Sequence, residues 1–183
     1  LGLVIEIIAV ALVAVLMPVG LSVWWQLIPM AAYGLGLGFA SAQLTSVVLS
    51  EVPIMQSGEG SATQSTVRQL GTAVGSAISG ASLAMAVNGT LPARLESLGL
   101  PAKVGDGLAQ AVSGSAGGVI GVFRSGYGPA ARFGDEAPKI ADAMTSGFIE
   151  GGQWTLLVAG IMLFIGLLAS VAVRRAASSH NVR

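Results

Sequence analysis

The stretch from Val52 to Ala86 reads VPIMQSGEGSATQSTVRQLGTAVGSAISGASLAMA. It begins as a short polar segment and continues, after Gln69, as a run without charge. At 100° per residue, this run has one bulky apolar face and an opposite face of small residues. A helix in water carries charge opposite its bulky face, whereas a helix in lipid uses small residues to approach another helix closely. The stretch therefore predicts a transmembrane helix over residues 67–87. Its small face holds the predicted helix-packing residues Gly71, Gly75 and Ser79.

The composition of the whole chain supports a membrane protein. Hydrophobic residues make up 53% of the 183 residues and charged residues only 10%, whereas soluble domains carry about 25% charge. The formal net charge is zero, so there is no electrostatic basis for binding nucleic acid. The chain has no cysteine, and its one histidine, His180, lies near the C-terminus. We therefore expect no disulfide, no metal site, no cofactor and, without a nucleophile–base pair, no enzymatic activity.

Four apolar segments are long enough to cross a bilayer, which predicts an all-α polytopic membrane protein. The predicted transmembrane helices are residues 1–19, 23–49, 67–87 and 151–173. The last of these is followed at once by Arg174 and Arg175.

The arginines next to the last apolar segment set the predicted orientation. Arg174, Arg175 and Arg183 lie in a tail without acidic residues, which favours the cytoplasmic side. The expected parts outside the bilayer are a cytoplasmic loop at 50–66, a long extracytoplasmic loop at 88–150 and a cytoplasmic tail at 174–183. We expect the long loop to hold one or two short helices at the membrane surface, because its helical periodicity is weak.

One face of the predicted helix 23–49 carries polar and adaptable side chains. Gln26, Met30 and Tyr33 share this face and are the candidate residues of a substrate cavity. In the alternative interpretation, Gln26 and Tyr33 only form hydrogen bonds to neighbouring helices or lipid headgroups. The sequence leaves both interpretations open.

Two charged side chains near the ends of apolar segments also allow two interpretations each. Glu6 lies at a membrane interface, or it is an intramembrane carboxylate used in proton coupling. Arg68 extends to the lipid headgroups, or it holds a cytoplasmic gate by bonding to another loop.

Several short motifs occur in a fixed order between residues 34 and 80. They are Gly34-x-Gly36-x-Gly38, Val52-Pro53, Gly58-x-Gly60-Ser61-Ala62 and Arg68-Gln69-x-Gly71-x-x-x-Gly75. This order resembles the late spans of the fourteen-span drug:proton antiporters of the major facilitator superfamily (the EmrB/QacA type). The stretch Ser146-Gly147-Phe148, with the apolar run and two arginines after it, resembles the last span of that family.

The resemblance implies that the chain is a C-terminal fragment holding four helices of the six-helix C-terminal bundle. It implies that helix 23–49 lines the central cavity and that helix 67–87 packs near the other half of the transporter. The family's earlier motifs and coupling acids are absent here, so we expect no transport by this chain alone.

The leading hypothesis is therefore the C-terminal part of a proton-coupled multidrug efflux transporter. It is expected to be a multi-pass protein of the cell membrane that exports hydrophobic or cationic small molecules. Its partners would be membrane lipid and the remaining spans of the parent transporter. The alternative is a small membrane assembly or scaffold protein that acts through helix–helix packing.

Overall fold

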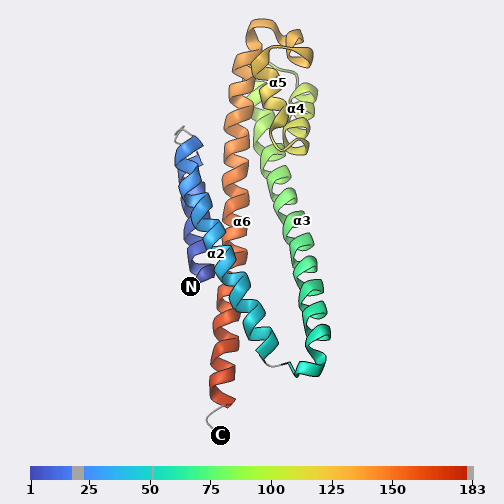
Figure 1. The fold of residues 1–183 in the computed structure, drawn as a ribbon. Coiled ribbons are helices and arrows are strands. Elements are labelled where there is room, and N and C mark those ends of the chain that lie inside the picture. The colour runs from blue at the N-terminus through green and yellow to red at the C-terminus, as the bar shows by residue number, and fades with distance from the viewer. Residues whose placement is uncertain (18–22, 51, 181–183) are drawn as a thin grey trace. The chain divides into compact units, whose positions relative to one another are not determined.

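The computed structural model describes residues 1–17, 23–50 and 52–180, and every regular element in these ranges is a helix (Figure 1). The predicted all-α class is thus confirmed for the described residues. The helices divide between two compact units. The first consists of Leu1–Ala77 and Leu156–Arg183, and the second of Ile78–Thr155. Because α3 and α6 are long, each of them contributes to both units.

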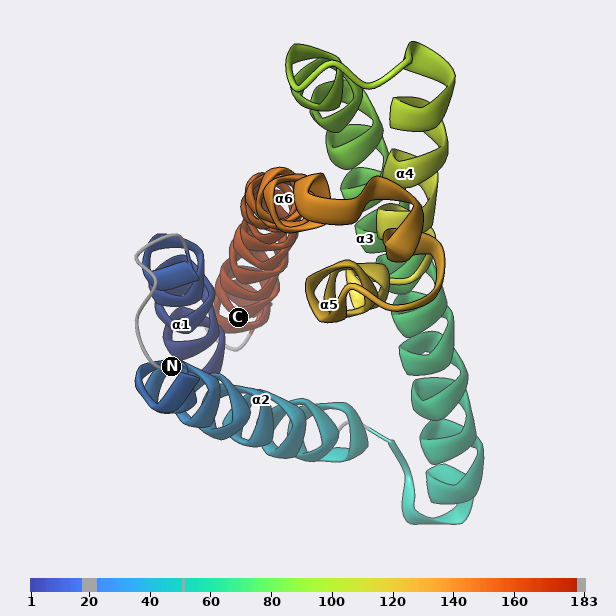
Figure 2. The same ribbon diagram turned by 90° about the horizontal axis from the view of Figure 1, so that it is seen from above.

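Helices α1 (Gly2–Leu16) and α2 (Val23–Ser50) pack against each other in the first unit, as Figures 1 and 2 both show. Small residues allow the backbones to approach closely at their crossing. A β-carbon at Gly2 would lie 2.6 Å from Ala40 N and 2.7 Å from Gly36 O. Pro29 lies inside α2 and is buried. Because proline has no backbone N–H, this turn of α2 lacks one helical hydrogen bond.

A short connection leads from α2 to α3. Pro53 has extended backbone angles, φ −55° and ψ 142°, and the 3₁₀ helix η2 (Ile54–Gln56) follows it. Helix α3 (Ser57–Ser97) then begins about ten residues before the predicted start of the transmembrane helix. The prediction of a loop was therefore wrong in conformation for residues 57–66, although the side of the membrane on which they lie stays a prediction.

Hydroxyl groups explain how α3 accommodates so many serines and threonines. Thr66, Thr72 and Ser76 each donate a hydrogen bond to the carbonyl four residues earlier, at 3.0, 2.9 and 2.7 Å. These bonds satisfy the hydroxyls within the helix itself. The polar composition that predicted a loop is therefore compatible with a helix.

The second unit contains the C-terminal part of α3, the short elements α4 (Ala102–Gly114), α5 (Gly118–Ser125) and η3 (Gly128–Glu136), and the first part of α6 (Ala137–His180). Figure 2 shows α4 beside α3. A shared apolar core holds these elements together. Its fully buried larger side chains are Val87, Leu91, Leu95, Val112, Phe123, Ile140 and Met144.

Residues 88–150, predicted as a long loop with one or two short helices, are mostly helical, because the long helices α3 and α6 also extend into this range. Leu91 and Leu95 continue the buried face of α3 past its predicted end, and Pro92 lies inside the helix rather than ending it. Tertiary packing of this face outweighs the cost of the proline. The periodicity looked weak because each short element supplies only a few core residues, several of them alanines.

Polar contacts join the helices of the second unit at its surface. Arg94 of α3 forms an ion pair with Glu150 of α6. Arg124 of α5 lies 3.5 Å from an Asp142 carboxylate oxygen and 3.3 Å from Thr145 Oγ1, both on α6. These side chains are well exposed, so each pair contributes little stability compared with the apolar core.

Three helical stretches among the described residues are long and apolar enough to cross a membrane: Trp24–Val48, Ile54–Ser97 and Gly128–Val173. By length and composition, this indicates a membrane protein. Helix α1 is apolar but has only 15 residues, about 22 Å of helix, against a hydrocarbon core of about 30 Å. The count of four spans therefore stays a prediction.

The ends of the predicted segments differ from those of the helices. Some predicted positions lie outside the described residues. They are Pro18 and Val19 at the end of the first predicted span, residue 51 in the predicted loop and Arg183 in the predicted tail. Helix α6 continues through Arg174 and Arg175 to His180, because arginine is a good helix former and a bilayer boundary does not have to end a helix.

Candidate functional site

The predicted cavity residues lie along one side of α2. Gln26 is half-buried, whereas Met30 and Tyr33 are 60% and 37% exposed. At 100° per residue, their face is turned about 60° from the direction of Pro29, Gly36 and Ala40, which lie toward α1. Helix α1 therefore borders the face without covering it.

The polar atoms of this face are available to a ligand. Within the described part of the chain, the side chains of Gln26 and Tyr33 form no hydrogen bond with another residue. Met30 adds a flexible apolar side chain between them, and Leu37 extends the face with a 47% exposed side chain. The face can thus offer an amide, a phenol ring and adaptable apolar contacts to a small molecule.

The predicted packing residues of α3 have room on their side of the helix. No atom of the described chain lies within 4 Å of a β-carbon placed at Gly71 or Gly75. Ser79 is half-buried. Among the described residues, no side chain packs against the small face at Gly71 or Gly75. The role of this face in helix packing therefore stays a prediction.

Arg68 lies more than two turns inside α3 rather than at its start. Its side chain is exposed and forms no ion pair with a described residue. The position is compatible with contact to lipid headgroups or to another segment, so the gate also stays a prediction.

Other glycines make the close helix contacts in this chain. A β-carbon at Gly151 would lie 2.7 Å from Val87 Cγ2, and one at Gly147 would lie 3.1 Å from Leu91 Cδ1. These contacts join α6 and α3 within the second unit. The signal was present in the sequence, because Gly147 and Gly151 form a G-x-x-x-G pattern at the start of the last apolar run.

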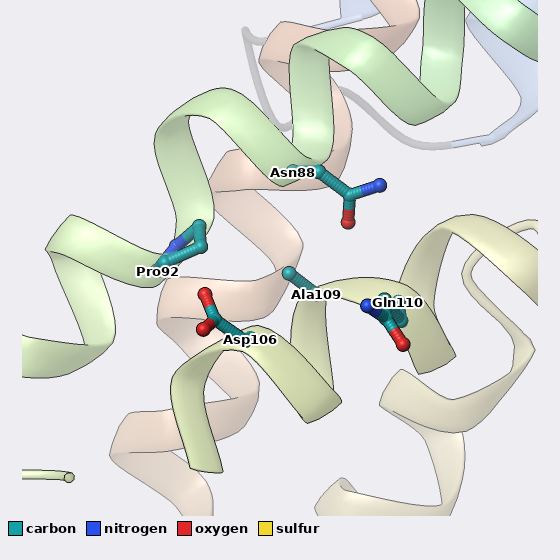
Figure 3. A pocket seen from close by; sticks show the side chains of 5 residues that line it. All are labelled: Asn88, Pro92, Asp106, Ala109 and Gln110. Carbon is teal, nitrogen blue, oxygen red and sulfur yellow. The ribbon is translucent and has the colours of Figure 1, made fainter. Parts of the chain in front are cut away.

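A shallow pocket in the second unit gathers polar side chains (Figure 3). It is lined by Asn88 and Pro92 of α3 and by Asp106, Ala109 and Gln110 of α4. The pocket has one carboxylate and no nucleophile paired with a base. It therefore offers hydrogen bonds to a polar molecule but no catalytic arrangement.

Glu6 is the buried charged residue of the described chain, with a relative exposure of 3%. It lies in the contact between α1 and α2, beside Gly36. Its Oε1 atom has no hydrogen-bond partner among the described residues. In the described part of the chain, the Glu6 carboxyl is therefore enclosed between two helices. This position fits the interpretation of an exposed carboxyl at a membrane interface less well.

No protein-family model, no curated protein and no solved structure matches the chain.

Proposed function

We propose that this chain is the C-terminal part of a proton-coupled multidrug efflux transporter of the major facilitator superfamily. In this proposal α1, α2, α3 and α6 belong to the C-terminal bundle of a multi-pass protein in the cell membrane. The exported compounds are hydrophobic or cationic small molecules.

The observation that carries the proposal is the open face of α2. This helix has no charged residue over its 28 residues, yet it presents Gln26, Met30 and Tyr33 on one side. A cavity for varied organic molecules needs apolar, adaptable walls with a few polar groups. An aromatic ring also attracts organic cations through its electron-rich face. The order of the glycine-rich motifs between residues 34 and 80 supports the same proposal.

The test compares this chain with the longer reading frame that the proposal requires. Each would be expressed in a host without its own efflux pumps, and uptake of a cationic dye into inverted membrane vesicles would be measured. We expect the longer protein to accumulate dye only while a proton gradient is present, and the 183-residue chain to accumulate none. Accumulation that persists after a protonophore collapses the gradient would contradict proton coupling.

The open small face of α3 favours the alternative function, a membrane scaffold that acts by helix packing. Gly75 and Ile78 distinguish the two functions, because Gly75 lies on the small face and Ile78 on the bulky face. For a scaffold, this chain alone would self-associate in lipid, and Gly75→Leu would abolish the association. For a transporter, Gly75→Leu would lower efflux by the longer protein more than Ile78→Leu does.

A further inference from the structure

Pro92 leaves one backbone oxygen of α3 without its usual partner beside the shallow pocket of the second unit. Because proline has no N–H, the carbonyl of Asn88, four residues earlier, lacks the donor that a regular helix would supply. Asn88 and Pro92 both line the pocket. The pocket therefore has a backbone oxygen that can accept a hydrogen bond from a ligand.

Helix α4 comes close to this turn of α3 at a glycine. A β-carbon at Gly105 would lie 3.5 Å from Pro92 O and 3.6 Å from Pro92 Cα. This contact places the next residue, Asp106, beside the turn, and Figure 3 shows the Asp106 carboxyl pointing toward Pro92. Gln110 lies one turn further along α4 on the same side, and the fully buried Ala109 lies next to it. The packing of the two helices thus brings a carboxylate and an amide to the open carbonyl.

The negative charge of Asp106 is not balanced within the described part of the chain. The ion pairs of the second unit join α3 to α6 and α5 to α6, and neither includes Asp106. Lys103, the one cationic residue of α4, forms no ion pair with it either. The side-chain amides of Asn88 and Gln110 can each turn an oxygen toward a ligand. The pocket therefore combines one negative charge with several further hydrogen-bond acceptors.

This set of groups distinguishes between classes of ligand. Ca²⁺ takes about six to eight oxygen ligands, commonly from several carboxylates, and the pocket has one carboxylate. A neutral polar molecule would leave the charge of Asp106 unpaired. A primary ammonium group carries one positive charge and three N–H donors, and charge-assisted hydrogen bonds are stronger than neutral ones. The pocket has a volume of about 190 Å³, whereas pockets for drug-sized molecules hold about 300–1,000 Å³, so the ligand must be small.

We propose that the pocket between α3 and α4 binds small molecules that carry a primary ammonium group. The ammonium donates hydrogen bonds to the Asp106 carboxylate and to the Asn88 backbone carbonyl. Its third N–H donates to the amide oxygen of Asn88 or Gln110, and the rest of the molecule lies toward the pocket opening. The pocket contains no residue of the α2 face, so this inference does not rest on the efflux proposal.

Nuclear magnetic resonance of the isotope-labelled full chain in lipid nanodiscs tests the binding. The probe is n-butylammonium, and the observed signals are those of the side-chain amides of Asn88 and Gln110. We expect both signals to shift until they saturate with n-butylammonium, and to stay unchanged with n-butanol, which has the same carbon chain without the charge. Absence of a saturable shift with n-butylammonium overturns the proposal, as do equal shifts with n-butanol or displacement of the probe by a lower concentration of Ca²⁺.

Three variants test the roles of the individual groups. Asp106→Asn removes the charge from an exposed position and should weaken binding by about ten- to a hundredfold. Pro92→Ala supplies the missing N–H to the Asn88 carbonyl and should weaken binding by about two- to tenfold. The matched control is Asp135→Asn, an exposed carboxylate of η3 that does not line the pocket, and it should bind as the wild type does.

Wild-type affinity in Asp106→Asn, or an equal loss in Asp135→Asn, overturns the proposal. Wild-type affinity in Pro92→Ala overturns the role of the backbone carbonyl. Pro92→Ala should also unfold at a higher temperature, because proline is unfavourable inside a helix, and this shows that its weaker binding does not come from unfolding. None of these measurements involves transport, so a failure of the dye assay leaves this inference standing, and its failure leaves the efflux proposal standing.

Discussion

Glu6 of α1 rests on the bare backbone of Gly36 of α2: a β-carbon at position 36 would lie 2.8 Å from Glu6 Cγ. No side chain larger than hydrogen fits there unless the helices move, because Glu6 N would be only 2.9 Å away. The sequence marked Gly36 as one of three alternating glycines, and the structure shows that it differs from both neighbours. In the part of the chain that the structure describes, no other helix lies within 4 Å of the β-carbon position at Gly34 or Gly38.

We therefore predict that Gly36→Ala weakens the contact between α1 and α2 by about 1–3 kcal/mol, the usual cost of an overpacked site. Gly38→Ala, on the same helix but in open space, is the matched control and should leave the contact unchanged. The measurement is the distance between spin labels on the two helices, together with the free energy of unfolding in mixed micelles. Equal effects of the two substitutions would show that the helices do not cross at Gly36.

The second prediction concerns the glycine contact between α3 and α6. Gly151→Leu should lower the free energy of unfolding of the second unit by about 1–3 kcal/mol. The β-carbon alone would lie 2.7 Å from Val87 Cγ2 and 3.3 Å from Leu83 Cδ1, and the β-branched Val87 is stiff. Gly160→Leu should have little effect, because no other described residue outside its own helical turn lies within 4 Å of the β-carbon position there. Thermal unfolding of both variants, followed by circular dichroism, makes the comparison, and a more stable Gly151→Leu variant would refute the contact.

The third prediction tests the orientation in the membrane. Met55 and Tyr127 are 96% and 79% exposed, and a chain without cysteine allows a single reactive thiol at either position. In intact cells, a membrane-impermeant thiol reagent should label Tyr127→Cys and should not label Met55→Cys. After the cells are opened, both positions should react. Labelling of Met55→Cys in intact cells would contradict the predicted orientation, because this position would then lie outside the cell.

The long apolar helices could be predicted from the sequence because an uncharged run as long as 154–173 cannot be buried inside a small soluble domain. The folded second unit could not. Its core joins Leu95, Val112, Phe123 and Met144 from four different helices, and no local window of sequence contains that pattern. The full length of α3 was missed because serine and threonine favour loops unless their hydroxyls bond within a helix, as that of Thr72 does.

The candidate site was predictable in its residue types but not in its surroundings. The spacing of Gln26, Met30 and Tyr33 placed them on one face, and their exposure depends on where α1 crosses α2. The enclosure of Glu6 also depends on that crossing. Sequence spacing fixes the face of one helix, whereas the contact between two helices is set by tertiary packing.

The efflux proposal depends most on the face of α2, and Tyr33 is the residue that probes it. An aromatic ring attracts an organic cation by about 0.5–2 kcal/mol, and about 1.4 kcal/mol corresponds to a tenfold change in affinity. In the longer protein, Tyr33→Ala should therefore weaken efflux of cationic compounds by about two- to thirtyfold while neutral compounds change less. Tyr33→Phe keeps the ring and should retain most recognition of cations.

The most direct measurement is the efflux of several cationic and neutral compounds by the wild type, Tyr33→Ala and Tyr33→Phe at matched protein levels. We predict a selective loss for cations in Tyr33→Ala and near wild-type efflux in Tyr33→Phe. An equal loss for every compound in Tyr33→Ala would contradict it, because Tyr33 would then support the structure of α2 rather than face a substrate.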